Sequence, residues 1–442
     1  MANASRPVGS TGDPGEFRSG ARPGLKLARV IAAALGFAGF LATHLYLGSA
    51  IARTGILHYF NVLFQSDCPR VIADLTSTDT EHFRTAVHPL FVLFFNPVGV
   101  FLTRVTGSQE LAGRLLSSVL GAATVVLAAE FFIAAGLGLV RSWLWACILG
   151  FSTAPLFWSS APECSVFSGA ALVLMSLLTL VRRDRLASSV AAGVLVLGTT
   201  LSNFAQAILL FRAGVRPGRG RMVRVGLFAT IVLAFAIGLS IAQRILYPTA
   251  VWFFVPAPYA EDIGYLAKLD APALVAERAA LVADHLLLFN IVAPRPHVVP
   301  LDTTLTDAVV RNIRALLPAR LPPPQITFEA HGLATMYREG GLAVFLWIAL
   351  TVLAVVRARK SRMTPIRSAL LLCIAFNGAL HLLYGDALFV YAPDWTFAVV
   401  ASVALAVGDA GGRAGNLVLG ALLALVASND LAFVRDVVGL YR

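Results

Sequence analysis

The sequence predicts an all-α polytopic membrane protein, a bundle of about eleven transmembrane helices with loops on the outer face. Of its 442 residues, 58% are hydrophobic and only 13% are charged, and the mean hydropathy is +0.78. A soluble domain carries about 25% charged residues, so no soluble fold of this length could hide so much apolar surface. The short alternating segments that a transmembrane β-barrel needs are absent from the sequence.

The apolar runs are about 20 residues long, the length of a helix that crosses a bilayer, and polar stretches separate them. Residues 1–24 are rich in Gly, Pro, Ser and Arg, and we expect a disordered cytosolic tail there. The first run, 27–50, has no small-residue cleavage site, so it should remain as the first helix. Further runs lie near 112–136, 142–160, 164–181, 187–201, 203–213, 222–245, 340–356, 366–384, 387–407 and 413–428.

Blocks of basic residues at the ends of these runs predict the orientation. They lie at 18–29, 182–185, 212–224 and 357–367. Basic residues favour the cytosolic side, so the net charge of +11 indicates topology rather than binding to nucleic acid. All blocks fall inside only if 88–106 lies on the outer face as an interfacial helix, and Pro97 within it disfavours a straight span.

The runs 187–201 and 203–213 are too short for two full spans. We interpret them as a short helical hairpin with Ser202 and Asn203 at its outer tip. One broken span is the alternative, and it would invert the topology of everything that follows.

The long hydrophilic region 247–338 divides the chain. An N-terminal transmembrane module, 25–246, precedes it and contains a first outer loop at 51–87; a C-terminal module, 339–442, follows. Apolar pairs recur every seven residues across 272–292, which predicts an amphipathic surface helix. A second short helix is expected at 305–317.

The predicted outer face gathers the polar residues of the chain. Asp67 lies at the membrane edge, where an acid is functional by default, and Glu163 lies where the third and fourth spans meet. Glu163 could equally cap the following helix. Candidate binding residues are Arg70, Asp74, His88, Asn203, Arg295, His381 and Asp386.

Several of these outer residues also have a purely structural interpretation. Asp74, Asp79 and Glu81 fit solvated loop acids or caps, and His82 fits a surface histidine. Tyr391 and Trp395 fit aromatic residues at the membrane interface.

The four cysteines form no framework. Cys147 and Cys373 lie within apolar runs as core residues, and a disulfide between Cys68 and Cys164 stays open. No spacing typical of metal ligands is present in the sequence. Whether the protein uses a divalent cation as a cofactor stays open.

The order of four motifs resembles the GT-C superfamily of integral membrane glycosyltransferases. These motifs are "SDCPRVIADL", "HPLF", "LAGRLLSSVLGAATVV" and "SSAPECSVF". The most similar branch contains bacterial proteins resembling protein O-mannosyltransferases and lipid A aminoarabinose transferases. The resemblance covers roughly residues 27–215 and is architectural beyond them.

This resemblance implies inverting transfer of a sugar from a polyprenyl-phosphate donor to a lipid, glycan or protein acceptor. It also implies a place in the inner (plasma) membrane, with the active site on the periplasmic face. Asp67 matches the first-loop catalytic acid, Glu163 the acid after the third span, and His88 the surface-helix histidine. The chain departs from the family pattern at Cys68, where a second acid is common, and at Pro162, where the family has Arg.

Two other classes of function are compatible with the sequence. A flippase for a lipid-linked glycan usually shows repeated halves and charges buried within its spans. Here the spans are almost free of charge, and Glu130 is the clearest exception, without an evident partner. A catalytically inactive scaffold of a glycan-assembly complex is the other alternative, and Cys68 allows it.

Overall fold

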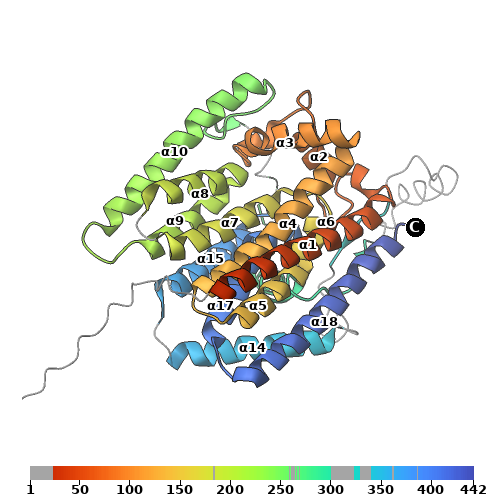
Figure 1. Ribbon diagram of the computed structural model, residues 1–442. Helices are drawn as coiled ribbons and strands as arrows, with labels where there is room; N and C mark the ends of the chain where they lie inside the picture. Colours follow the sequence, from red (N-terminus) through yellow and green to blue (C-terminus); the bar gives the residue numbers. More distant parts are fainter. Residues whose placement is uncertain are drawn as a thin grey trace, which may run out of the picture.

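The computed structural model describes residues 23–182, 185–257, 259, 264, 266–267, 269–299, 323–328, 340–360, 363–385 and 387–442. The fold is an all-α bundle of long apolar helices (Figure 1). Seven of its helices are long and apolar enough to cross a membrane, or eight if the bent pair α5 and α6 forms one span, counted over the described residues. The chain is therefore a multi-pass membrane protein.

The seven long apolar helices are α1 (Pro23–Ala52), α4 (Gln109–Ala134), α7 (Cys164–Val181), α10 (Arg221–Leu246), α14 (Gly341–Lys360), α15 (Pro365–Leu383) and α18 (Gly412–Gly439). The shorter elements are η1 (Ile56–His58), α2 (Cys68–Thr76), η2 (Phe83–Ala86), α3 (Phe91–Thr106), α5 (Leu139–Phe151), α6 (Thr153–Ser160), α8 (Leu186–Thr199), η3 (Leu201–Asn203), α9 (Phe204–Gly214), α11 (Pro272–Asp284), η5 (His285–Phe289), α16 (Leu388–Tyr391) and α17 (Pro393–Val407). Two short antiparallel strands, β1 (His297–Val298) and β2 (Ile326–Thr327), complete the set.

The run 142–160 is broken, whereas the sequence predicts one continuous helix. α5 and α6 meet at an angle of 61° around Ser152. Pro155 lies in the first turn of α6, where it has no N–H to continue the ladder of α5. α6 turns inward as a result, and its Trp158 donates a hydrogen bond to the carbonyl of Phe389 in α16 (2.8 Å).

α8 and α9 form the short hairpin that their lengths predict. The Thr179 hydroxyl, near the end of α7, lies 3.3 Å from the carbonyl of Leu210, near the end of α9. α7 and α9 therefore run in the same direction. α8, which connects them in the chain, runs in the opposite direction. The tip of the hairpin is η3, which contains Ser202 and Asn203.

α3 does not run the length of the bundle but lies across one end of it (Figure 1). Leu90, just before α3, donates a backbone hydrogen bond to Gly198 at the end of α8 (2.8 Å). Glu110, just after α3, pairs with His58 beyond the end of α1 (3.2 Å). Both ends of α3 thus lie at the same end of the bundle. We call this the site end.

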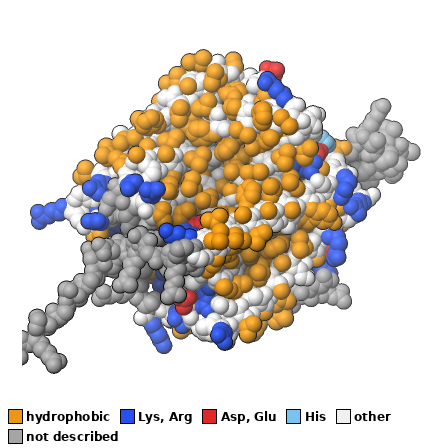
Figure 2. Space-filling model, in the orientation of Figure 1, with side chains coloured by type: hydrophobic (Ala, Val, Ile, Leu, Met, Phe, Trp, Pro, Cys, Tyr) orange, Lys and Arg blue, Asp and Glu red, His pale blue; other side chains and the backbone are white. Residues whose placement is uncertain are grey.

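The opposite end, which we call the basic end, carries the turns between α4 and α5, α14 and α15, and α17 and α18. These turns surround a groove of about 930 Å³, which is lined in part by Arg357, Lys360 and Arg367. Between the two ends, hydrophobic side chains cover most of the face in Figure 2. α10 also has exposed apolar side chains such as Val223 and Phe235, which suit contact with lipid.

Glu130 has a partner, contrary to the expectation from the sequence. Its carboxylate forms an ion pair with Arg29, joining the end of α4 to the beginning of α1. A charged side chain within a membrane helix is stabilised by such a pair. The ion pair with Arg29 therefore accounts for the presence of Glu130 in α4.

The amphipathic pattern at 272–292 forms α11 and a π-helical turn, η5, that packs on α15. Arg278 of α11 donates hydrogen bonds to the carbonyl of His381 (3.0 Å) and to that of Gly385 at the end of α15. A cation at this position complements the negative end of the helix. The helix predicted at 305–317 lies outside the described residues, and so does the tail up to residue 22.

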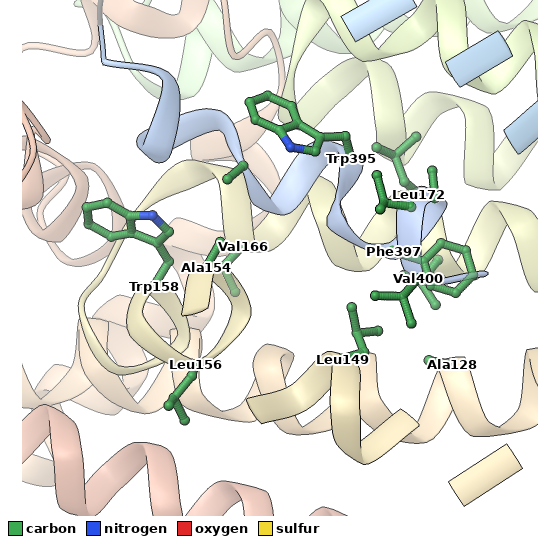
Figure 3. Close-up of a cluster of buried hydrophobic side chains, with 14 of the residues drawn as sticks. Ala128, Leu149, Ala154, Leu156, Trp158, Val166, Leu172, Trp395, Phe397 and Val400 are labelled. Carbon is green, nitrogen blue, oxygen red and sulfur yellow. The ribbon is translucent and has the colours of Figure 1, made fainter. Parts of the chain in front are cut away.

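The core beneath the site end is aromatic and aliphatic. Figure 3 shows Trp158 of α6 and Trp395 and Phe397 of α17 around Val166 and Leu172 of α7. Trp395 is 1% exposed, so it is a core residue and the expectation of an interface aromatic was wrong. This packing holds the first turns of α7 and α17 side by side, which brings together the acids at their N-termini.

Candidate functional site

An unusual backbone segment, 61–66, presents Asp67. Asn61, Phe64 and Gln65 have positive φ angles of 60°, 51° and 59°, a conformation that costs a non-glycine residue about 1–2 kcal/mol. Backbone hydrogen bonds with Ile326 hold the segment, from the Phe64 N–H (3.1 Å) and to the Val62 carbonyl (3.0 Å). Strain of this kind persists only where the surroundings enforce it.

Asp67 precedes α2 at its N-cap position, yet its side chain makes no capping hydrogen bond. Its Oδ2 lies 3.3 Å from Nε of Arg70 instead, and the side chain stays 33% exposed. The carboxylate is therefore turned away from the helix amides and remains accessible for another partner.

Arg70 links Asp67 to a buried acid. Its Nη1 donates to Oδ2 of Asp74 (3.0 Å), and the other oxygen of Asp74 lies 2.8 Å from Nδ1 of His82. Asp74 is 3% exposed and His82 is fully buried. The expectations of a solvated loop acid and a surface histidine were wrong, because both residues belong to a network that locks Arg70 in place.

Glu163 is both a helix cap and a residue of the site. Its Oε1 accepts a hydrogen bond from the backbone N–H of Cys164 (2.9 Å), which caps α7. Burial raises the pKa of Glu163 to about 7; Arg70 lowers it and the Asp67 carboxylate raises it further. The structure therefore confirms the helix cap, and Glu163 also lines a cavity with Asp67 and Arg70.

His88 connects the "HPLF" motif to the tip of the α8–α9 hairpin. Its Nδ1 lies 2.7 Å from the carbonyl of Thr199, and a carbonyl can only accept, so Nδ1 carries the proton. Burial lowers the pKa of His88 to about 3, with further lowering from Arg70 and Arg84. The ring is neutral at pH 7, and Nε2 is an acceptor.

Two cavities meet at this position. The acid cavity, about 110 Å³, is lined by polar residues that include Asp67, Arg70, Arg84, His88, Glu163 and Asp394. The aromatic cavity, about 280 Å³, is lined by residues that include Tyr259, Asn377, His381, Tyr384, Tyr391 and Asp394. Their shared walls are Arg84, His88, Thr200, Tyr391 and Asp394. Together they form one two-lobed site.

Asp394 is a site residue that the sequence analysis missed. It lies in the first turn of α17, accepts a hydrogen bond from the Ser168 hydroxyl, and lies beside Asn203. Only 7% of the residue is exposed. The sequence could have indicated this residue, because Asp394 is an acid in the apolar stretch "YAPDW" and an acid within the membrane usually has a functional role.

The other predicted residues fall in three groups. Asn203 lies behind Asp394, and His381 lines the aromatic cavity. Arg295 is not among the residues that line either cavity. Asp386 lies outside the described residues.

Neither a disulfide nor a metal cluster is found in the part of the chain that the structure describes. Cys68 and Cys164, the pair that spacing left open, are buried free thiols. No group of three or more His, Cys, Asp or Glu side chains could hold a metal ion there.

Comparisons of this chain with protein-family models, with curated proteins and with solved structures found no match.

Proposed function

We propose that this protein is an integral membrane glycosyltransferase of the GT-C type that transfers a sugar from a polyprenyl-phosphate donor to a lipid, glycan or protein acceptor. The supporting observation is that Asp67, Glu163 and His88, which match motif positions far apart in the sequence, lie around one cavity with Arg70 and Arg84. The combination of a base, cations and a neutral histidine suits transfer from a phosphate leaving group.

In the proposed reaction Asp67 takes the proton from the acceptor hydroxyl. The acceptor oxygen forms a bond to the anomeric carbon while the bond from that carbon to the phosphate oxygen breaks, with inversion. Polyprenyl phosphate leaves as the anion, and the guanidinium groups of Arg70 and Arg84 stabilise its charge. Asp74 keeps Arg70 oriented because it holds Nη1.

The proposed orientation places the site end on the outer face of the inner membrane. The groove at the basic end carries Arg357, Lys360 and Arg367, and basic residues favour the cytosolic side. A site at this level is open to a donor whose phosphate lies in the outer headgroup layer.

The function is tested by Asp67→Asn in detergent with a polyprenyl-phosphate sugar. Asparagine keeps the shape but cannot accept the proton, so turnover should fall about 10²–10⁴-fold. Asp79→Asn is the matched control, because Asp79 is an exposed acid of the same loop. Thermal stability should be close to wild type in both variants.

Other outcomes separate the alternatives. Normal turnover in Asp67→Asn would exclude Asp67 as the base. A wild-type protein that moves a lipid-linked glycan between leaflets without forming a glycosidic bond would be a flippase. A protein that binds the donor and does neither would be a scaffold.

A further inference from the structure

The aromatic cavity has a chemistry different from that of the acid cavity. The acid cavity brings together carboxylates and guanidinium groups, whereas the aromatic cavity has tyrosine rings and apolar walls such as Leu201 and Leu380. Among the described residues that line it, Arg84 is the one cation, and Arg84 stands where the two cavities meet. A ligand that extends through both would place its anionic part near Arg84 and its neutral part among the tyrosines.

Polar groups on one wall of the aromatic cavity present acceptors. Asn377 donates one Nδ2 hydrogen to the carbonyl of Cys373 (2.9 Å), and its Oδ1 is an acceptor. His381 has Nδ1 3.2 Å from the carbonyl of Tyr384, so Nδ1 carries the proton and Nε2 accepts. The Asp394 carboxyl group is the third acceptor, and it lies on the wall that both cavities share.

These acceptors are held rigidly. Asp394 is bound by the Ser168 hydroxyl from α7 and lies beside Asn203 from the hairpin tip. The His381 ring contacts those of Tyr391 and Trp395, with a distance of 5.0 Å between ring centroids in each pair. The Tyr259 hydroxyl is anchored on the carbonyl of Ala86 (2.8 Å). A wall of fixed acceptors selects a ligand with several O–H donors.

Size limits the ligand further. At about 280 Å³ the aromatic cavity lies just below the range of about 300–1,000 Å³ for pockets that enclose drug-sized ligands. It has room for one ring and not for a chain of sugars. The aromatic rings suit packing against the C–H faces of a sugar, and the neighbouring hydrogen-bond acceptors suit its O–H groups.

We infer that the aromatic cavity is the subsite for the sugar of the donor, that it takes a single neutral monosaccharide, and that Asp394 binds the hydroxyl groups that determine which sugar is accepted. This inference rests on the proposed function for the class of donor. It assigns Asp394, Asn377 and His381 to sugar recognition and leaves proton transfer to Asp67.

The experiment compares the affinities of purified protein in detergent for a short-chain polyprenyl phosphate and for the same lipid carrying mannose, glucose, galactose or arabinose. Wild-type protein should bind at least one sugar-bearing lipid more tightly than the sugar-free lipid. Asp394→Asn should weaken this sugar-dependent gain in affinity by about 10-fold, because an NH₂ group replaces one of the two acceptor oxygens, and should keep its affinity for polyprenyl phosphate.

Two further variants make the test independent of damage at Asp394. Leu380→Trp places a bulky ring in the aromatic cavity and should remove the same difference while leaving polyprenyl phosphate binding intact. Asp409→Asn changes an exposed acid at the basic end, with 71% of its side chain accessible, and should behave as wild type.

The outcomes separate this inference from the proposed function. If wild type binds every sugar-bearing lipid no better than polyprenyl phosphate, or if Asp394→Asn and Leu380→Trp keep the sugar-dependent gain, the sugar subsite is overturned. Sugar transfer in those same samples would leave the transferase function standing. Conversely, sugar binding that depends on Asp394 in a protein that transfers nothing would support the subsite and reject the transferase.

Discussion

The segment 61–66 at the site end and the turn 408–412 at the basic end both contain residues with positive φ, but they achieve it with different residues. The turn uses glycines, with φ of 54° at Gly408 and 76° at Gly411, and so avoids the steric cost of a Cβ atom. The site segment uses Asn61, Phe64 and Gln65 and carries that cost.

The difference shows where packing maintains a strained backbone. Phe64 is 3% exposed, and its ring lies 4.7 Å from that of Phe328, 4.9 Å from that of Phe389 and 5.5 Å from that of Phe157. The turn at the basic end needs no such support. Side chains in the site segment can therefore line a cavity, as Asn61 and Gln65 do, while Asp67 is held at a defined position.

The largest expected effect on stability comes from removing the side chain that supports the site segment. Phe64→Ala should lower the free energy of unfolding by about 3–5 kcal/mol, because it leaves a cavity in the aromatic cluster. Denaturation of the purified protein measures it. Phe60→Ala is the control just before the segment, since Phe60 is 58% exposed. Equal losses in both variants would mean that the cluster does not support the segment.

The next effect concerns Glu163 and depends on pH. Because burial raises its pKa from 4.5 to about 7, the folded state holds its proton more tightly than the unfolded state. Its contribution to stability is therefore fully present below pH 4.5 and lost as the pH rises through 7. A shift of this size corresponds to about 3 kcal/mol.

Thermal melts between pH 4.5 and 8 compare wild type with Glu163→Gln. The variant cannot ionise at this position, so its loss of stability across this range should be about 3 kcal/mol smaller than that of wild type. Asp409→Asn at the basic end should retain the wild-type dependence, because Asp409 is largely exposed. If Glu163→Gln keeps the same pH dependence, Glu163 is not the group responsible.

The smallest effects are expected from two substitutions, one in each region, that should change stability in opposite directions. Gly408→Ala adds a Cβ at φ 54° and ψ −138°, a region used almost only by glycine, and should cost about 1–3 kcal/mol. Gln65→Gly relieves a left-handed residue and should raise stability by about 0.5–1 kcal/mol after the entropic cost of glycine. Chemical denaturation of both proteins decides the sign. A loss of stability in Gln65→Gly would show that segment 61–66 is not strained.

The sequence by itself determined the membrane class and most of the helices, because hydropathy over about 20 residues depends only on local composition. The run 164–181 appears as α7 (Cys164–Val181), and the short hairpin follows from the lengths of its two runs. The motifs also pointed to Asp67, Glu163 and His88, which line one cavity. The break between α5 and α6 was readable from Pro155 but was not predicted.

Only the tertiary structure decided which polar residues are buried together. Asp74 is in a buried network because His82 and the amide of Asn96, which donates to its backbone carbonyl (2.9 Å), come from other elements. Glu130 meets Arg29 across two helices, and Asp394 reaches the site because α17 packs against α7. The residues of these two pairs are separated by 101 and 226 positions in the chain. Burial of a charged group depends on partners from these distant segments, and no local pattern contains them.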